Sequence, residues 1–315
     1  MDKNLSKKLD KIIRENLEFR PIRKINLLEG GLSKSRNYKI ILEDGRNLFV
    51  KIFPISYENR IKKEEIALRL LKNTEIPAPK LFYINYEFNN GEGVLIQEYI
   101  EGRSLKNILK KGSFNKRTLE ESGKFLAKLH KYSFMGEWQD PKSKIKSKEE
   151  WIKEKVKKRN NSNIENLKKL EILSAEKIRR MEKYIDNFEK ELNSYDFKLC
   201  PLHGDYNLEN IMINEGKVKG ILDFEQHHMG HNLSDLGIAY YWFKFEGFER
   251  LFNFFLEGYK KEFAVKMDIT RFLHGYYIMQ VIGAISFLSK EKSSEKPLEI
   301  LKDMLSEFVS IVIKE

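Results

Sequence analysis

The sequence predicts a bilobal α+β protein, with a small antiparallel β lobe followed by a larger, mostly helical lobe. In the first hundred residues, short runs rich in β-branched and aromatic residues alternate with turn signals, which is typical of strands. From about residue 104 onward, apolar residues recur mainly at helical spacing. We therefore expect one lobe over residues 1–99 and a second over residues 100–315.

The small lobe is predicted from five β-rich runs and one helix. The runs span residues 25–28, 38–42, 47–53, 81–86 and 94–99. Asp44-Gly45 and Asn90-Gly91 are hairpin signals within two of the connections. A helix is expected over about residues 57–73, and it ends before Pro77 and Pro79 because a residue before proline disfavours helical backbone. Together these elements predict a small antiparallel sheet that carries one helix.

The large lobe is predicted to be helical with one exception. An amphipathic helix is expected over residues 119–132, and residues 233–315 alternate between helix and turn signals. Around residues 200–224, two short apolar runs flank Asn214-Glu215-Gly216, which predicts a hairpin. Two lobes in one chain predict a ligand-binding cleft between them.

Composition excludes several classes of protein. Hydrophobic residues make up 41% and aromatic residues 12% of the chain, so global disorder is not expected. We find no apolar run that approaches the roughly 18–20 residues needed to span a bilayer. The N-terminus lacks the apolar stretch of a secretory signal. The single cysteine, Cys200, allows no internal disulfide, so we expect a cytoplasmic protein without a membrane partner.

The net charge of +11 is concentrated in one segment. Residues 142–183 contain 15 lysines and arginines against 7 acidic residues, a net of +8. Apolar residues such as Trp151, Val156, Leu167 and Ile178 are spaced through these charges, which predicts helices with a face to bury. We interpret the charges as a solvated helix surface, and attraction of an anionic ligand is the less favoured alternative. A nucleic-acid partner is not expected, because interleaved aromatics and a recognition module are missing.

The most informative motif begins at His203-Gly204-Asp205 and continues to Asn210. An aspartate followed five positions later by asparagine is the pattern of a phosphoryl-transfer loop, in which the aspartate accepts a hydroxyl proton and the asparagine holds a metal ion. Thirteen residues after Asn210, Asp223 follows a short predicted strand. Oxygen ligands of this kind suit Mg²⁺. The sequence therefore predicts Asp205 as catalytic and Asn210 and Asp223 as magnesium ligands.

A lysine and a glutamate give this motif a context. Lys51 lies in the middle of an otherwise apolar strand, where its ammonium group needs a partner or a route to solvent. In phosphoryl-transfer enzymes of this type, a strand lysine contacts ATP phosphates and pairs with a glutamate on the next helix. Glu64 shares a helix face with Ile61, Leu68 and Leu71, so we expect it to be that partner. The alternative is that Glu64 is only a charge in the first turns of the helix.

Two further segments, the loop with Gly30 and Gly31 and the segment 97–100, are predicted to bind the nucleotide. Paired glycines let a backbone approach phosphate, although the loop before Lys51 could also be a plain hairpin. The segment at the junction of the lobes is expected to present backbone groups to adenine. The residues assigned to nucleotide binding, besides Lys51 and Glu64, are Gly30, Gly31, Ser33, Ser35, Gln97, Glu98, Tyr99 and Ile100.

These motifs together resemble the aminoglycoside phosphotransferase/choline kinase-like family, the small-molecule branch of the protein-kinase-like fold. The resemblance extends over nearly the whole chain and includes segments 76–79, 98–105 and 126–130. His203-Gly204-Asp205 and Asp223-Phe224-Glu225 replace the His-Arg-Asp and Asp-Phe-Gly of protein kinases. No Ala-Pro-Glu element follows, which disfavours a protein substrate. The resemblance implies ATP and Mg²⁺ as cofactors, and it implies that Asp235 braces the catalytic loop.

The chain departs from the family pattern at Leu208 and Glu209, where proline and then glycine or aspartate are often found. Neither change removes a group that the chemistry requires. We expect His203 to support the loop and Glu225 to assist metal or acceptor binding. The basic segment after His130 corresponds to the most variable part of the family, so it does not define the acceptor.

The sequence thus predicts an ATP-dependent kinase that phosphorylates a hydroxyl group of a small molecule. Aminoglycosides, choline-like alcohols, homoserine and sugars all remain open as acceptors, because the fold does not choose among them. A catalytically silent scaffold of the same fold is the alternative, and retention of the four residues Lys51, Asp205, Asn210 and Asp223 argues against it. The sequence does not define an oligomeric state.

Three other features are weighed against this interpretation. The spacing of His227, His228 and His231 matches no standard zinc signature, so we expect a loop that flanks the active site. Cys200 near His203 could suggest a thiol nucleophile, but a lone cysteine beside leucines is more often a small buried residue. The aromatic residues between 240 and 255 are expected to form mostly helix core.

Overall fold

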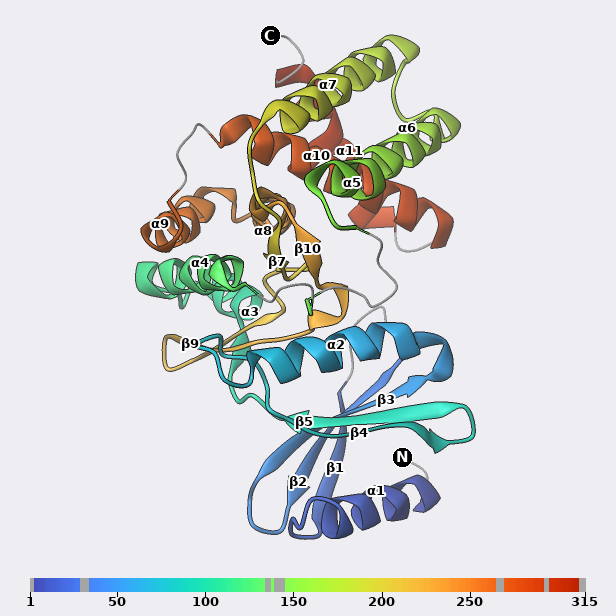
Figure 1. Ribbon diagram of the computed structural model, residues 1–315, viewed down its shortest axis with the longest axis vertical. Coiled ribbons are helices and arrows are strands. Elements are labelled where there is room, and N and C mark those ends of the chain that lie inside the picture. The colour runs from blue at the N-terminus through green and yellow to red at the C-terminus, as the bar shows by residue number, and fades with distance from the viewer. Residues whose placement is uncertain are drawn as a thin grey trace. The chain divides into compact units, whose positions relative to one another are not determined.

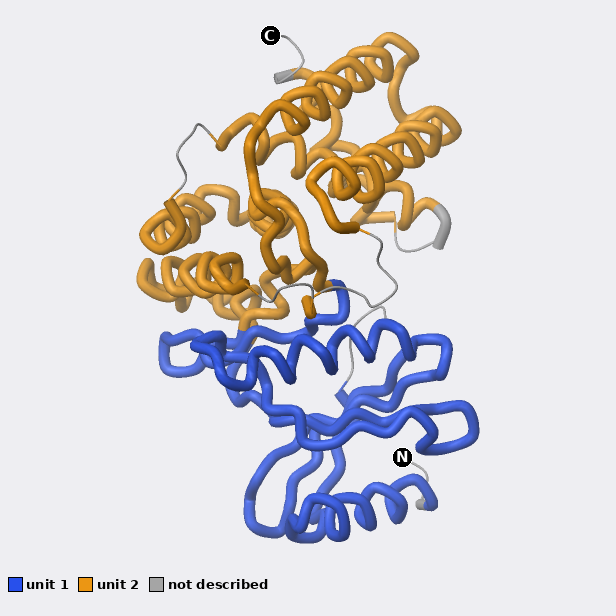
Figure 2. The backbone as a smooth tube through the Cα atoms, viewed as in Figure 1, with its two compact units in different colours: residues 1–103, 212–226 blue, residues 104–211, 227–315 orange. Residues whose placement is uncertain are grey.

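The structure is a computed structural model that describes residues 3–28, 34–133, 137–138, 145–264, 269–291 and 295–311. The chain divides into two compact units, one of residues 1–103 with 212–226 and one of residues 104–211 with 227–315 (Figure 2). The hairpin segment 212–226 thus belongs to the first unit, although it follows much of the second in sequence. The assignment of residues 1–99 to ATP binding and of residues 100–315 to catalysis stays a prediction.

The first unit is built on an antiparallel sheet, as predicted (Figure 1). Its five strands lie in the order β1-β2-β3-β5-β4. Their bounds are β1 Ile22–Leu28, β2 Arg36–Leu42, β3 Asn47–Pro54, β4 Leu81–Asn89 and β5 Glu92–Glu98. The unit also contains a 3₁₀ turn Ile55–Tyr57, α2 Glu58–Leu71, strand β9 Lys217–Ile221 and a 3₁₀ turn Phe224–Gln226; β8 Ile211–Asn214 and β6 Arg103–Ser104 lie at its boundaries in sequence.

Two helices cover the two faces of this sheet (Figure 1). α1, Lys3–Glu15, is not among the predicted elements, although Leu5, Leu9 and Ile13 recur at helical spacing. These three side chains pack on one face with the core residues of β2, β3 and β5. On the other face, Ile61 of α2 packs against Phe53 and Leu95. Because strand side chains alternate between faces, Val50 faces α1 and Lys51 faces α2.

The second unit is mostly helical, which confirms the predicted fold class (Figure 1). The helices are α3 Leu105–Lys110, α4 Lys116–Lys131, α5 Lys148–Trp151, a π-helical segment Ile152–Lys157, α6 Lys158–Leu170, α7 Ala175–Ser194, α8 Asn232–Phe245, a 3₁₀ turn Glu249–Leu251, α9 Phe252–Glu262, α10 Thr270–Glu291 and α11 Glu295–Ile311. Two short strands, β7 Cys200–Leu202 and β10 His228–Gly230, pair antiparallel.

The basic segment forms helices with a buried face, as its apolar spacing predicts. Trp151, Val156, Leu167 and Ile178 are all buried. A hydrophobic core of this unit joins side chains of α6, α7, α8, α10 and α11. The lysines and arginines from Lys148 to Lys183 therefore lie on helices that pack into the unit rather than on a detached arm.

α10 contains no uninterrupted apolar run of membrane length, yet its length and composition are those of a membrane-spanning helix. Within the described residues, Thr270–Ser289 is the one stretch of helix long and apolar enough to cross a membrane by length and composition. Tyrosines, glycines and a glutamine interrupt its apolar residues, so no contiguous run reveals it. In the structure 61% of its most apolar window is buried. Residues such as Tyr276, Val281 and Ile285 pack in the helical core, which is the behaviour of a core helix.

Helices α4 and α9 approach each other closely because each carries a glycine at the contact. A Cβ atom on Gly123 would lie 1.9 Å from the carbonyl oxygen of Phe255, and one on Gly258 would lie 1.8 Å from that of Glu120. These distances are far below van der Waals contact. The atoms that would clash belong to the backbone of the opposite helix, which cannot move away as a flexible side chain can. α4 also carries His130, so this packing fixes a residue of the site described below.

We predict that Gly258→Ala lowers the free energy of unfolding by about 1–3 kcal/mol, because the added methyl group forces the two helices apart. Urea denaturation followed by circular dichroism measures this change. Arg117→Ala, at an exposed position of α4, is the control and is expected to change stability by less than about 0.5 kcal/mol. Equal stability of the Gly258→Ala variant and the parent would contradict the close packing.

A buried histidine makes stability depend on pH. His231 precedes α8, its Nδ1 lies 2.9 Å from the hydroxyl of Tyr276, and its ring lies 4.1 Å from that of Phe197. Burial, with a smaller contribution from nearby His130, lowers the pKa of His231 to about 3. The unfolded chain has a histidine pKa of about 6.5. Between these values the unfolded state binds a proton that the folded state does not, so folding stability falls as pH falls.

We predict that His231→Phe flattens the decline of the melting temperature between pH 6.5 and pH 4, since the variant has no proton to gain on unfolding at this position. Differential scanning calorimetry across this range is the measurement. Parent and variant curves that run parallel from pH 6.5 to pH 4 would show that His231 does not carry the pH dependence.

Candidate active site

The predicted catalytic loop runs from the end of β7 to the start of β8, and local hydrogen bonds hold its shape. The side-chain oxygen of Asn207 accepts the N–H groups of Glu209 at 2.8 Å and Asn210 at 3.1 Å. The amide of Asn210 donates to the backbone oxygen of Asp205 at 3.0 Å and to its carboxylate at 3.4 Å. The structure therefore brings the predicted catalytic aspartate and the predicted metal-binding asparagine into contact.

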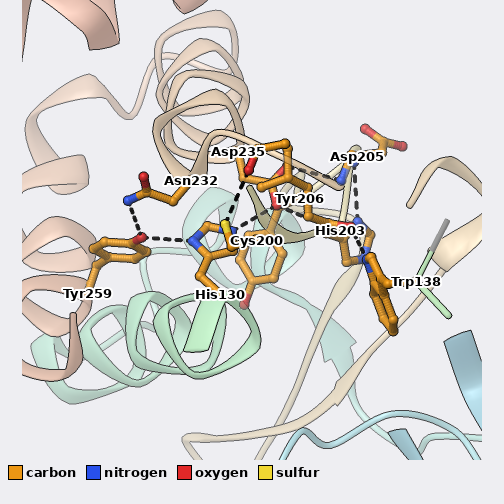
Figure 3. A network of polar contacts seen from close by, with 12 residues as sticks. His130, Trp138, Cys200, His203, Asp205, Tyr206, Asn232, Asp235 and Tyr259 are labelled. Carbon is orange, nitrogen blue, oxygen red and sulfur yellow. Dashed lines mark hydrogen bonds and ion pairs between the residues drawn. The ribbon is translucent and has the colours of Figure 1, made fainter. Parts of the chain in front are cut away.

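A buried carboxylate anchors the start of this loop (Figure 3). Asp235 on α8 accepts the backbone N–H groups of His203 at 2.7 Å and Gly204 at 3.0 Å. Burial alone would raise the pKa of Asp235, but hydrogen bonding and charge from His130 and His203 lower it overall. The group is thus an anion that fixes the backbone two residues before Asp205. This is the bracing role that the family resemblance implies for Asp235.

His130 links Asp235 to a chain of polar groups (Figure 3). Its Nε2 lies 3.1 Å from the Asp235 carboxylate, and its Nδ1 lies 2.8 Å from the hydroxyl of Tyr259. The amide of Asn232 donates to the same hydroxyl at 2.9 Å. Because the ionised Asp235 carboxylate can only accept a hydrogen bond, Nε2 of His130 carries the hydrogen and donates it to Asp235. Tyr259 and Asn232 were not predicted as site residues, and only the Leu-His pair at the end of α4 could have pointed to His130.

His203 supports the loop from within, as expected. Its side chain is fully buried, and its Nδ1 accepts the backbone N–H of Asp205 at 3.3 Å. Gly204 between them has φ of 82°, a left-handed backbone that glycine adopts without strain. Trp138 donates its indole N–H to the carbonyl of Leu202 at 2.9 Å, one residue before the motif (Figure 3).

Glu209, which departs from the family pattern, is fixed by contacts with α3 and with the residue before this helix. Its carboxylate accepts from the hydroxyl of Ser104 at 3.1 Å and lies 2.9 Å from the ammonium of Lys106. The backbone N–H of Lys106 donates to the carbonyl of Leu208 at 3.0 Å. The same ammonium lies 2.8 Å from Glu246, whose side chain is 9% exposed. The two positions that depart from the family pattern are thus tied to α3 by contacts of their own.

The first unit contains the predicted lysine–glutamate pair. Lys51 on β3 and Glu64 on α2 are 2.7 Å apart, with side chains 9% and 2% exposed. Burial lowers the pKa of Lys51, but the carboxylates of Glu64, Asp223 and Glu225 outweigh it and raise the pKa overall. The ammonium therefore stays charged inside the unit, where its positive charge is available to a bound anion.

Three carboxylates of the first unit converge beside Lys51. Ligand oxygens of Glu64, Asp223 and Glu225 lie within 4.8 Å of one another. Glu225 also approaches Lys51 at 3.9 Å and Arg60 at 3.5 Å. Among the described residues, this is the group of acidic and histidine side chains whose geometry could hold a metal ion, and the histidines at 227, 228 and 231 do not form one.

Asp223 has two features of a strained functional residue. Its φ is 62°, in the left-handed region that costs a non-glycine residue about 1 kcal/mol or more. Its Oδ1 is buried and has no hydrogen-bond partner within the described residues. A buried carboxylate oxygen without a donor is destabilising unless a cation or a ligand satisfies it. The donor set here therefore fits a hard divalent cation such as Mg²⁺.

The structure describes some of the other residues that are predicted to bind the nucleotide. Gly30, Gly31 and Ser33 lie outside the described residues, and Ser35 lies just before β2. Gln97 and Glu98 end β5, with Tyr99 and Ile100 directly after it. The N–H of Glu98 donates to the carbonyl of Lys80 at 2.8 Å, which removes that donor from the set expected for adenine. The roles of the remaining residues in nucleotide binding stay predictions.

Cys200 does not have the properties of a nucleophile. Its Sγ lies 3.4 Å from the carbonyl oxygen of Gly230, across the β7–β10 pair. Burial raises the pKa of the thiol well above its ordinary value. Since the thiolate is the reactive form, this environment keeps the cysteine unreactive.

The model of the phosphotransferase enzyme family matches residues 24–272. The chain belongs to this family. The match includes the strand lysine, the catalytic loop, Asp223 and Asp235. The comparison with curated protein sequences finds no match.

Solved structures of low sequence identity share the fold over almost the whole chain. A Ralstonia eutropha protein named for the aminoglycoside phosphotransferases is 17% identical, with a TM-score of 0.71 over 97% of this chain and 98% of that chain. Aminoglycoside phosphotransferase APH(4)-Ia is 11% identical, with a TM-score of 0.68 and the same coverage. Amicoumacin kinase hAmiN is 14% identical, with a TM-score of 0.65 over 98% of this chain and 96% of that chain. These structures confirm the protein-kinase-like fold.

We predict that Lys106→Met lowers the free energy of unfolding by about 1–2 kcal/mol, because it leaves Glu209 and the largely buried Glu246 without their shared donor. Chemical denaturation measures the change. Lys110→Met is the matched control, since Lys110 contacts only Glu246, at 3.1 Å, from a side chain 52% exposed. If both variants lose the same stability, the link from α3 to the catalytic loop contributes nothing of its own.

Proposed function

We propose that the protein transfers the γ-phosphoryl group of ATP to a hydroxyl group of a small molecule, with Mg²⁺ as the cofactor ion. The observation that carries the proposal is the catalytic loop, in which Asp205 and Asn210 are in contact and Asp235 fixes the backbone before them. Membership of the phosphotransferase enzyme family supports the same reaction class.

Each residue has a distinct task in this reaction. Asp205 orients the acceptor hydroxyl and accepts its proton as the oxygen attacks the γ-phosphorus. Lys51, held by Glu64, binds phosphate oxygens and offsets their negative charge. Asn210 and Asp223 would hold the magnesium ion, which supplies charge neutralisation at the transferring phosphoryl group. Positioning supplies most of the remaining acceleration, because phosphoryl transfer asks for little covalent help.

Structural relatives support nucleotide and cation use. One structure of APH(4)-Ia is a ternary complex with ADP and hygromycin B. The hAmiN structure contains AMP-PNP, Ca²⁺ and Ami. By analogy we infer ATP and Mg²⁺ for this chain, a cytoplasmic location where ATP is abundant, and an acceptor of the aminoglycoside, choline-like, homoserine or sugar type.

The direct test is an ATP-consumption screen over aminoglycosides, amino alcohols, hydroxy amino acids, sugars and sugar phosphates in the presence of Mg²⁺, with mass spectrometry of the products. The expected result is acceptor-dependent ADP release and a product that has gained one phosphoryl group. Tight ATP binding without turnover on any acceptor class would favour the catalytically silent scaffold instead.

We predict that Asp205→Asn binds Mg²⁺ and ATP as the parent does but loses about 10²–10⁴-fold in kcat, because the asparagine cannot accept the hydroxyl proton. Steady-state kinetics and calorimetry separate the two effects. Asp186→Asn, an exposed position on α7, is the control. A near-normal kcat in Asp205→Asn would remove this residue from the mechanism.

We predict that Asp223→Ala abolishes the magnesium dependence of nucleotide binding, because the variant lacks the carboxylate that holds the ion. Calorimetric titration with ATP, with and without Mg²⁺, measures it. A magnesium effect of unchanged size in this variant would place the metal elsewhere.

A further inference from the structure

One arginine of the basic segment is placed unlike its neighbours. Arg159 is the second residue of α6, directly after the π-helical segment, and its guanidinium reaches α10. Its Nη2 donates to the side-chain oxygen of Gln280 at 2.9 Å. One turn further along α10, a Cβ atom on Gly283 would lie 3.0 Å from Nη2 and 3.7 Å from Nε. The guanidinium therefore lies against a helix face that a larger residue at 283 would crowd.

The charge of Arg159 is not compensated by a carboxylate. Three other cations of the segment have acidic partners: Lys158 pairs with Glu154, Lys168 with Glu165 and Glu182, and Arg180 with Glu176. Lys153, Lys155 and Lys157 form no ion pair within the described residues either, but their side chains are exposed and Arg159 differs from them in its packing against α10. Within the described residues, Arg159 forms no ion pair, and its guanidinium contacts the neutral amide of Gln280. Packing among the helices lowers the pKa of its guanidinium without any acid to oppose it. The side chain nevertheless keeps contact with solvent, so a solute can reach it.

The groups around this guanidinium are donors. The amide nitrogen of Asn163 lies 3.7 Å from the same Cβ position at Gly283 that the arginine nitrogens surround. It donates to the carbonyl of Met279 at 3.4 Å, which uses one of its two hydrogens. Gln280 gives its oxygen to Arg159, so its remaining polar group is an NH₂ donor. Two neutral oxygens, those of Gln280 and Met279, accept from these nitrogens, but within the described residues no carboxylate pairs with Arg159. The remaining N–H groups favour an anion, and a guanidinium matches the two oxygens of a carboxylate or phosphate.

The same helices connect this position to the catalytic loop of the unit. α10 packs against α8, where Gly237 contacts Tyr276 and where Tyr241 shares the core with Val281. Tyr241 lies near enough to Asp205 for that carboxylate, after burial, to raise the pKa of its hydroxyl. Thus α8 carries a side chain beside Asp205 and packs against α10, which carries the arginine contact.

We propose that Arg159, with Gln280 and Asn163, binds a carboxylate or phosphate group of the acceptor. The inference rests on the proposed function and narrows its acceptor to a small hydroxyl compound that carries a negative charge. Hydroxy amino acids and sugar phosphates fit this description. Polycationic aminoglycosides do not, because their ammonium groups would be repelled by an uncompensated guanidinium.

The first test measures the anion site without any reaction. Parent, Arg159→Gln and the control Arg180→Gln are titrated with inorganic phosphate, and separately with acetate, at constant ionic strength, while arginine side-chain Nε signals are followed by nuclear magnetic resonance. The expected result is a saturable shift in the parent and in Arg180→Gln that is lost in Arg159→Gln. The anion that gives the larger shift distinguishes phosphate from carboxylate. Identical titrations of the parent and Arg159→Gln overturn the proposal.

The second test uses matched acceptors in the ATP-consumption assay, namely homoserine against homoserine amide and a sugar phosphate against the free sugar. We expect the anionic member of the active pair to have a kcat/KM at least about tenfold higher, and we expect Arg159→Gln to remove that preference. A neutral or cationic acceptor used equally well by the parent and Arg159→Gln overturns the inference. If no acceptor is phosphorylated while phosphate or acetate binding still depends on Arg159, the proposed function fails and the anion site stands.

Discussion

The proposed catalytic loop, from His203 to Asn210, depends on one buried carboxylate. Asp235 accepts two consecutive backbone N–H groups, those of His203 and Gly204, and it is itself held by His130. An anion in a buried position is costly unless donors surround it, so this group is stable only while the loop, α4 and α8 are all in place. The position of Asp205 is therefore coupled to the packing of the helical unit. The glycine contacts between α4 and α9 and the hydroxyl of Tyr259 contribute to the same coupling, because they hold α4 and His130 in position.

Much of this arrangement could be predicted from the sequence, because it follows from local periodicity. Alternation along β3 turns Lys51 away from the face of Val50, and helical spacing on α2 turns Glu64 inward, so their pairing needs no further information. The spacing from Asp205 to Asn210 likewise places both in one loop. The chain from Asn232 through Tyr259 to His130 could not be predicted, because its members come from three helices far apart in sequence. The hydropathy of α10 is not evident from the sequence, because its apolar residues are interrupted.

The sequence also reveals only part of what the structure shows about the charges of the basic segment. The count of lysines and arginines identifies the basic segment, and their alternation with acids explains the ordinary surface pairs of Lys158 with Glu154 and of Arg180 with Glu176. The sequence does not reveal that Arg159 packs against α10 without an acidic partner, since this depends on where α6 meets α10. An arginine that packs against a second helix without an acidic partner therefore carries more information about a ligand than the net charge of the whole segment.

Asp223 combines a left-handed backbone, an unsatisfied buried oxygen and two neighbouring carboxylates. Each of these raises the free energy of the folded chain, and none is needed to complete the sheet or the core. A glycine at this position would relieve both the backbone strain and the crowding of negative charge. A variant selected only for thermal robustness would thus be expected to lose this aspartate early. The presence of Asp223 in the sequence indicates that a requirement other than folding maintains it. It therefore limits the stability that an active form of this protein can reach.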